Sequence, residues 1–398
     1  MTQKRNVLIV TTYKWNFRKI AMELDKPSLK NWRSHPFSAW AFRHVREIIP
    51  TAEVKNDPAK IWDLKFVKPP LQCETLAKVQ NEIGLDALVI ASGNSIVYEY
   101  YGNGAEADDQ HILFSVSKSL LGLISDCLIS DKIIRKDDKI TDHLHELCGT
   151  AYDEATISQA LDMRIDVDFD EDYTATEGPI IDYRYAANWN PTPEKMQNFN
   201  PKQFFKSLKT KNGLHGGNFH YISPNTDVLA WLFERASGRR YNELLSYYLW
   251  KPLGCERSAY ITVDRSGGMR AAGGICATPR DLARVGLMLA NNGKKDGQQI
   301  ISKAWLADVY GSGDKEAWDK GSFKEFFGPR SMHYKSKWYV CHDQGKLLHG
   351  FGIHGQYLFV DPEKKMSIAW LSSEATALDK NSNNKILKFV DEIRNLLF

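Results

Sequence analysis

Two kinds of hydrophobic pattern occur along this chain, one with the period of a strand and one with that of a helix. Residues 85–93 (LDALVIASG) and 95–102 (SIVYEYYG) are apolar runs joined by a Gly-Asn turn, which predicts a β-hairpin. Strand-like runs return near the other end, at residues 347–362 and 364–373, followed by a helical pattern over 383–397. We therefore expect a sheet assembled from both ends of the chain.

The middle of the chain has helical periodicity. A helix is predicted to begin near Ser115, and further helical segments are predicted at 157–163, 201–208, 225–238, 241–254 and, after a glycine-rich turn, within 267–293. Shorter helical candidates lie nearer the N-terminus, at 40–50 and 74–84. Residues 168–193 are irregular and too long for a simple connection, which favours a functional loop.

These patterns predict an α+β protein whose antiparallel sheet comes from both termini, is flanked by helices and carries an inserted, mainly helical lobe. The expected organisation is an N-terminal extension packed on the core (1–60), a sheet lobe (61–125 with 261–398) and a helical lobe (126–260). The aromatic N-terminal extension is a candidate for a homodimer contact.

Charge and hydropathy exclude several classes of partner. The chain has 52 basic and 49 acidic residues, a net charge of +3, which is too close to neutral for a nucleic-acid binder. No apolar run approaches the roughly 18 residues that span a bilayer, and the N-terminal run VLIV is too short for a signal-peptide core. We expect a cytoplasmic protein with no membrane or nucleic-acid partner.

The cysteines lack the spacing of a metal site or a disulfide framework. None is part of a Cys-x-x-Cys pair, so buried free thiols in a reducing compartment are the favoured interpretation. The six are Cys73, Cys127, Cys148, Cys255, Cys276 and Cys341.

The candidate chemistry begins with Ser-x-x-Lys. The motif occurs three times, and the copies at 312–315 and 382–385 lie in polar, loop-like sequence that would not desolvate a lysine. In the copy FSVSKSLLG, Ser115 and Lys118 are one turn apart at the start of an apolar helix, so their side chains can meet. The helix dipole there stabilises an alkoxide or oxyanion. A catalytic pair and an ordinary N-capping serine remain open alternatives.

Two later elements favour catalysis. The segment FHYISPNTDVLAW places Tyr221 and Ser223 directly before a helix, although a strand-edge tyrosine and a Ser-Pro helix start would look the same. Residues 352–355 (GIHG) interrupt a strand-like run, and glycines within a strand often mark close approach of a ligand or another backbone.

In this order the three elements resemble the serine β-lactamase and penicillin-recognising enzyme superfamily. Within it, the likeness is strongest to the 6-aminohexanoate-dimer hydrolase (nylon-oligomer hydrolase) family, relatives of class C β-lactamases and esterases. It also includes DFDEDY, AAGGICATPRDLARVG and GIHGQYLFVDP, and extends over most of the chain from about residue 30. The resemblance implies a serine β-lactamase-like fold and an amidase or esterase that needs no metal or organic cofactor.

The resemblance also implies roles for individual residues. Ser115 would be the acylating nucleophile, Lys118 its base and Tyr221 a proton relay, while the backbone amides of Ser115 and Ile353 would form the oxyanion hole. Tyr173, in DEDY, would hydrogen-bond the leaving nitrogen during amide cleavage.

The substrate-selecting residues depart from the family pattern. Arg184 aligns with an aspartate that holds the substrate's ammonium end, and Asp182 is two residues away. A guanidinium would repel an ammonium and favour a carboxylate or another acceptor. Ala272 replaces a polar residue near the same pocket. GIHG stands where β-lactam-handling relatives usually have Lys-Thr-Gly, and Arg184 or His354 could take the place of that missing cation.

The sequence therefore predicts a serine hydrolase that cleaves a small-molecule amide or carboxylic ester through an acyl-enzyme on Ser115. The alternatives are a class C-fold carboxylesterase, a weak β-lactamase and a non-catalytic ligand-binding member of the fold.

Overall fold

The largest element of the structure is a twisted sheet that joins the two ends of the chain. The structure, a computed structural model, describes residues 26–67, 76, 84–343 and 345–396. Within these residues eight strands form one sheet, antiparallel except for the parallel pairing of β2 with β4. Their order is β10 (Met332–Lys335), β11 (Trp338–Cys341), β12 (Leu347–Gly352), β13 (Gln356–Asp361), β14 (Met366–Ser372), β3 (Leu85–Ser92), β4 (Ser95–Tyr101) and β2 (Lys65–Phe66).

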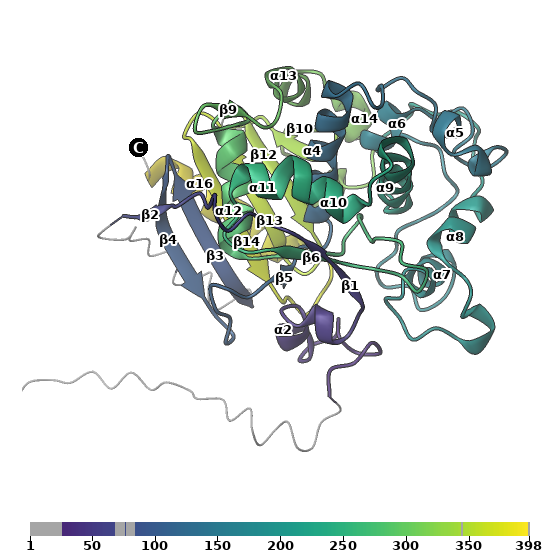
Figure 1. The fold of residues 1–398 in the computed structure, drawn as a ribbon, viewed down its shortest axis with the longest axis horizontal. Coiled ribbons are helices and arrows are strands. Elements are labelled where there is room, and N and C mark those ends of the chain that lie inside the picture. Colours follow the sequence, from purple (N-terminus) through teal and green to yellow (C-terminus); the bar gives the residue numbers. More distant parts are fainter. Residues whose placement is uncertain (1–25, 68–75, 77–83, 344, 397–398) are drawn as a thin grey trace, which may run out of the picture.

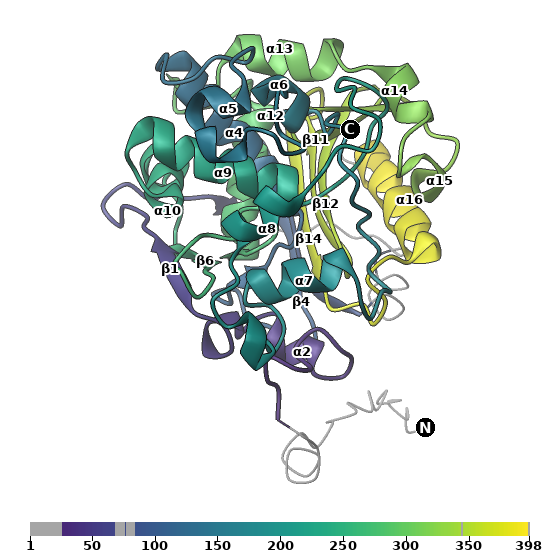
Figure 2. The ribbon, with the colours of Figure 1, turned by 90° about the vertical axis from the view of Figure 1, so that its right-hand side faces the viewer.

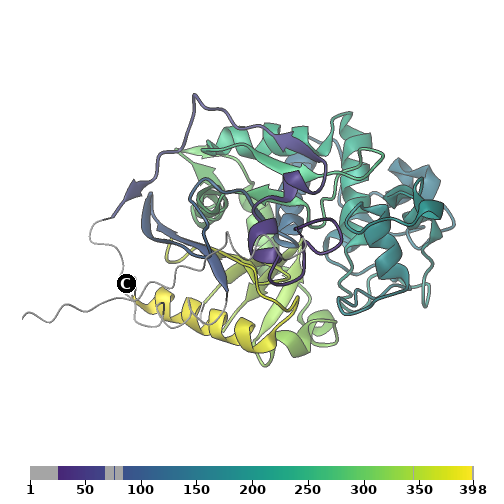
Figure 3. The ribbon, with the colours of Figure 1, turned by 90° about the horizontal axis from the view of Figure 1, so that it is seen from below.

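Helices cover both faces of this sheet. In β3, Leu88 and Ile90 belong to one hydrophobic cluster and Val89 to another, because successive side chains point to opposite faces. The first face packs against α16 (Lys380–Leu396) and the second against α12 (Pro279–Ala290). Figure 3 shows these two helices on opposite sides of the strands. Burial on both faces explains why β3 reads as a continuous apolar run rather than an alternating one.

A smaller sheet leads the chain into the helical region. Among the described residues it has the order β1 (Thr51–Val54), β6 (Ala259–Thr262), β7 (Ile275–Ala277) and β5 (His111–Ile112). Figure 2 shows β1 and β6 side by side, below α10. Because β5 pairs with β7, residues just after 112 are brought next to residues just before 275.

The middle of the chain forms helices on one side of the large sheet (Figure 1). The most central is α4 (Val116–Ser130), which is buried around almost its whole circumference and contacts both β12 and α9. The others are α5 (Ile140–His143), α6 (Ile157–Leu161), α7 (Pro179–Ala186), α8 (Pro201–Ser207), α9 (Pro224–Ser237), α10 (Tyr241–Leu245), the π-helical η4 (Ser246–Trp250) and α11 (Lys251–Leu253).

Short elements complete the described chain. They are α2 (Ser38–Ala41), η1 (Val45–Glu47), η2 (His145–Leu147), η3 (Glu194–Met196), β8 (Lys294–Lys295), β9 (Gln298–Gln299), α13 (Lys303–Gly311), α14 (Lys315–Asp319) and α15 (Lys324–Phe327).

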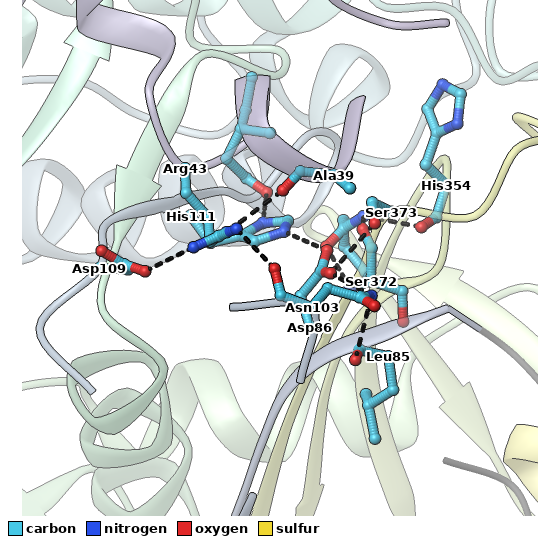
Figure 4. A network of polar contacts seen from close by, with 12 residues as sticks. Ala39, Arg43, Leu85, Asp86, Asn103, Asp109, His111, His354, Ser372 and Ser373 are labelled. Atoms are coloured by element: carbon cyan, nitrogen blue, oxygen red, sulfur yellow. Dashed lines mark hydrogen bonds and ion pairs between the residues drawn. The ribbon is translucent and has the colours of Figure 1, made fainter. Parts of the chain in front are cut away.

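The segment around α2 is tied to the core by polar contacts as well as by apolar packing. Arg43 donates hydrogen bonds to Asp109 and to the carbonyl of Asn103. Figure 4 shows Asn103 next to Asp86, a buried carboxylate that also interacts with His111 and accepts a hydrogen bond from Ser373. This network connects the N-terminal segment to β5 and to the strands at the centre of the sheet.

The predicted strands and most helices are confirmed, with two differences. The irregular stretch 168–193 contains α7, whose start at Gly178-Pro179 is a usual helix-start signal that its weak apolar period hid. The helical candidate at 40–50 is split between α2, which begins two residues earlier, and η1. The candidate at 74–84 lies outside the described residues, apart from Leu76, which is buried, and Gly84, which is exposed.

The expectations for the cysteines are confirmed only in part. The five described cysteines are all unpaired, as expected, although Cys148 is exposed rather than buried. Cys73 lies outside the described residues. Over the ranges that the structure covers, no helix is long and apolar enough to cross a membrane.

Candidate active site

The start of α4 is a sharp turn that presents Ser115. The chain leaves the short strand β5, passes through Phe114 at a φ of 41°, and enters the helix with Ser115 at the N-cap. A positive φ is strained for a bulky residue and persists only where the surroundings hold it. Here the Phe114 ring is packed among Trp32, Phe42 and Trp189, which fix the turn from two other segments.

Lys118 lies one helical turn after Ser115 and its side chain points back to it. Its Nζ donates hydrogen bonds to the Ser115 hydroxyl at 2.7 Å and to the Ala272 carbonyl at 2.6 Å. Lys118 is only 1% exposed. Burial lowers the pKa of Lys118 from 10.5 to about 8, against the opposing attraction of Glu171. An appreciable fraction of this amine is therefore neutral near physiological pH.

Tyr221 comes to the same place from the turn before α9. The Lys118 Nζ lies 5.0 Å from the centre of its ring, and the interaction of the Tyr221 hydroxyl with Ser115 opposes the rise in the pKa of Tyr221. The side chain is buried, with Phe323 packed edge-on against it at 4.9 Å. Burial and the nearby Glu171 raise the pKa of Tyr221 well above its ordinary value, so the phenol keeps its proton. The structure thus brings Tyr221 to the Ser115 and Lys118 pair, although the sequence separates it from both by more than a hundred residues.

Ser115 and Ile353, whose backbone amides are the predicted oxyanion hole, both line the pocket beside this cluster. Gly352, at the end of β12, lies so close to the start of α4 that a Cβ there would be 2.9 Å from the Ser115 nitrogen and 2.7 Å from the Leu113 oxygen. Only glycine permits this approach. Ser115 and Ile353 lie outside the sheet ladders and the helix interior. Among the described residues, the N–H of neither one donates a backbone hydrogen bond. Both donors are therefore available to an oxygen bound at this point.

An open pocket of about 390 Å³ adjoins the Ser115 side chain, part of it in contact with solvent. It contains the predicted substrate-binding residues Tyr173, Arg184 and Ala272. The whole lining is Arg33, Phe114, Ser115, Glu171, Tyr173, Ile180, Arg184, Trp189, Ser223, Arg270, Ala272, Gly273 and Ile353.

His354 has a different position. Its ring packs against Phe42 and Phe114, and its Nδ1 is 2.7 Å from the carbonyl oxygen of Glu374. It is not among the residues that line the pocket. Its role in substrate binding remains a prediction, whereas its packing helps to hold Phe114.

Glu171 is a site residue that the sequence analysis missed. Its carboxylate accepts hydrogen bonds from the hydroxyls of Tyr173, at 2.9 Å, and Ser223, and from the Ser223 amide. It therefore connects the loop before α7 to the first turn of α9. A glutamate in an irregular acidic stretch gives no sequence signal for this bridging position.

Behind the pocket lies a buried ion pair that the sequence analysis also missed. Asp227 pairs with Arg270 and accepts hydrogen bonds from the Tyr183 hydroxyl and, at 2.7 Å, from the Ala272 amide. Because the Ala272 carbonyl in turn accepts from Lys118, this pair supports the peptide that orients the lysine.

Comparisons with known proteins identify the family of the chain. A family model described as Beta-lactamase matches residues 74–390. The 6-aminohexanoate-dimer hydrolase of Paenarthrobacter ureafaciens is 36% identical over 357 residues, which are 87% of this chain and 88% of the relative.

Two solved structures extend the likeness. A Bacillus anthracis protein, assigned provisionally as a 6-aminohexanoate-dimer hydrolase, superposes with a TM-score of 0.82 at 25% identity, over 93% of this chain and 97% of the other. A family VIII carboxylesterase shares the fold, with a TM-score of 0.58 at 13% identity over 80% of this chain and 97% of the other.

The fold and these relatives define the class of the protein: it is a serine hydrolase that acts on amides or esters. The chain belongs to the beta-lactamase family and, within it, to the group of the 6-aminohexanoate-dimer hydrolases.

Proposed function

We propose that this chain hydrolyses an amide or ester through an acyl-enzyme on Ser115. The observation that carries the proposal is the hydrogen bond between the Ser115 hydroxyl and a buried Lys118, whose pKa is lowered to about 8. A neutral amine at this position can take the serine proton as the oxygen attacks the substrate carbonyl. Ser115 then carries the acyl group.

The remaining groups have complementary parts in the reaction. The free amides of Ser115 and Ile353 would bind the tetrahedral oxyanion. Tyr221, a neutral phenol in contact with both Ser115 and Lys118, would pass a proton to the leaving alcohol or amine. Water, deprotonated along the same route, would then release the acyl group as a carboxylate.

Labelling by a serine-directed fluorophosphonate tests the nucleophile. We expect one adduct, mapped by peptide mass spectrometry to the peptide containing Ser115, and no adduct in Ser115→Ala. Ser312→Ala, which removes the serine of an exposed Ser-x-x-Lys copy, serves as the matched control and should label like the wild type. Unchanged labelling of Ser115→Ala, or labelling at another serine alone, would rule out this assignment.

Tyr173 would discriminate between amides and esters. Its hydroxyl lies at the pocket and donates its one proton to Glu171, so it would have to turn away from that carboxylate to donate to a leaving nitrogen. An amide nitrogen must be protonated as it leaves. The alkoxide or phenoxide of an alcohol with a low pKa can leave with less assistance from a proton donor.

We expect Tyr173→Phe to lower kcat for an anilide by about tenfold or more and to lower it much less for the corresponding p-nitrophenyl ester. Both rates are measured on the same variant, so a loss of folded protein affects them equally. Equal losses on the two substrates would contradict this role.

The physiological substrate is proposed from the name of the curated relative. The curated relative's name specifies the 6-aminohexanoate dimer, so this amide is the first substrate to test on the present chain. Absence of turnover in a broad ester and amide screen, together with reversible ligand binding, would favour a non-catalytic binding protein instead.

A further inference from the structure

Three arginines from separate segments converge on the pocket beside Ser115. Arg33 comes from the segment before α2, Arg184 from the last turn of α7 and Arg270 from the loop before β7. Arg33 lies outside residues 74–390, the part of the chain that matches the family model. The pocket therefore contains a cation that the family-defining region does not supply.

Among the described residues, two of these guanidinium groups form no ion pair with a carboxylate. Arg33 donates to the side-chain oxygen of Asn190, a neutral acceptor, and its buried Nε has no hydrogen-bond partner. In the described part of the chain, no hydrogen bond or ion pair reaches the half-buried guanidinium of Arg184. Only Arg270 is paired, with Asp227.

The nearby carboxylates offset only part of the charge of the two arginines: Glu171 attracts Arg184, but among the described residues neither Glu171 nor Asp227 is hydrogen-bonded to Arg33 or Arg184. Glu171 is occupied by the hydrogen bonds of Ser223 and Tyr173, and Asp227 by Arg270, Tyr183 and the Ala272 amide. Asp172 attracts Arg184, but it is exposed and bonded to Thr174.

The arginines also repel one another. Burial, together with the charges of Arg184 and Arg270, lowers the pKa of Arg33 to about 9. An anion placed between Arg33 and Arg184 would relieve this repulsion and satisfy donors that the protein itself leaves unpaired.

Resting on the proposed acyl-enzyme mechanism, we propose that the acyl part of the substrate ends in a carboxylate that Arg184 and Arg33 bind in this pocket. Guanidinium groups match the geometry of a carboxylate, and an ammonium group would be repelled by Arg33 and Arg184. The acyl part stays attached to Ser115 through both steps, so its far end is the group that the adjoining pocket can hold throughout. The substrate class is then a monoester or monoamide of a dicarboxylic acid.

Three p-nitrophenyl esters of equal chain length test this. They are the monoester of adipic acid, the ester of hexanoic acid and the ester of 6-aminohexanoic acid, which end in an anion, a neutral group and a cation. We expect kcat/KM to be highest for the adipate and lowest for the 6-aminohexanoate, with about tenfold or more between adipate and hexanoate. An adipate ester hydrolysed no faster than the hexanoate would overturn the proposal.

Variants then assign the effect to the arginines. The ratio of kcat/KM for adipate to that for hexanoate should fall towards one in Arg184→Ala and fall in part in Arg33→Gln. It should invert in favour of the 6-aminohexanoate ester in Arg184→Asp. Arg239→Ala removes a positive charge that does not line the pocket and should leave the ratio unchanged. A ratio unaltered in both Arg184 variants would contradict the assignment.

The same substrates distinguish a failure of the acyl-enzyme mechanism from a failure of the carboxylate site. If Ser115→Ala hydrolyses p-nitrophenyl acetate as fast as the wild type, the acyl-enzyme mechanism fails. If hydrolysis depends on Ser115 but shows no preference for the adipate ester, the mechanism stands and only the carboxylate site fails. The wild-type comparison of three esters requires no variant to fold.

Discussion

Replacing Lys118 by alanine is expected to lower kcat/KM for p-nitrophenyl acetate by between about 100-fold and 10,000-fold, the usual contribution of a positioned general base. The lysine is the one basic group hydrogen-bonded to the Ser115 hydroxyl among the described residues. Without it, the serine must lose its proton to water. Lys118→Arg should be similarly impaired, because a guanidinium keeps the positive charge but does not give up its proton.

The pH dependence of the wild type checks the same assignment. The base must be neutral, so the rate should rise with pH as Lys118 loses its proton and level off above about 8, the lowered pKa of this amine. An ordinary lysine would place the rise near 10.4.

The control is Lys315→Ala, which removes the lysine of an exposed Ser-x-x-Lys copy and should leave both the rate and the pH profile unchanged. Substantial activity in both Lys118 variants would show that another group accepts the proton.

Two of the side chains proposed to react could be identified from the sequence because their contact is encoded locally. Ser115 and Lys118 are one helical turn apart, so the motif itself fixes their contact once the helix forms. Tyr221 depends on a long-range contact, and it was found through its place in an ordered set of motifs rather than through its own surroundings. The strands and central helices followed equally well from hydrophobic period.

Tyr173, Arg184 and Ala272 were predicted as pocket residues, but other residues that line or support the pocket could not be predicted, because their contacts are distant in sequence. Glu171 joins the loop before α7 to α9, and Arg33 reaches the pocket from an extension with no recognisable motif. Arg270 and Asp227 are 43 residues apart and belong to segments that look respectively like a turn and an ordinary helix start. Charges of this kind appear on the surface in most sequences, so their burial has no local signal.

Loss of the Asp227 carboxylate is expected to have the largest effect on stability. Asp227→Ala should lower the free energy of unfolding in urea by about 3–5 kcal/mol, the usual effect of removing one partner of a buried ion pair. The change leaves the Arg270 charge, which is 7% exposed, and the Ala272 amide without their partner. Asp319→Ala, which breaks a surface ion pair with Lys324, is the matched control and should cost less than about 1 kcal/mol.

A second substitution separates the effect of leaving the Arg270 charge unpaired from the effect of losing the support of Lys118. Asp227→Ala combined with Arg270→Met removes both charges, and it should recover part of the stability that Asp227→Ala loses, because no ion remains buried alone. The Ala272 amide stays unsatisfied in both variants, so the Lys118 acceptor on the same residue is still poorly held. We therefore expect the double variant to regain stability without regaining the wild-type rate of fluorophosphonate labelling. Recovery of both together would mean that Asp227 supports the fold but does not position Lys118.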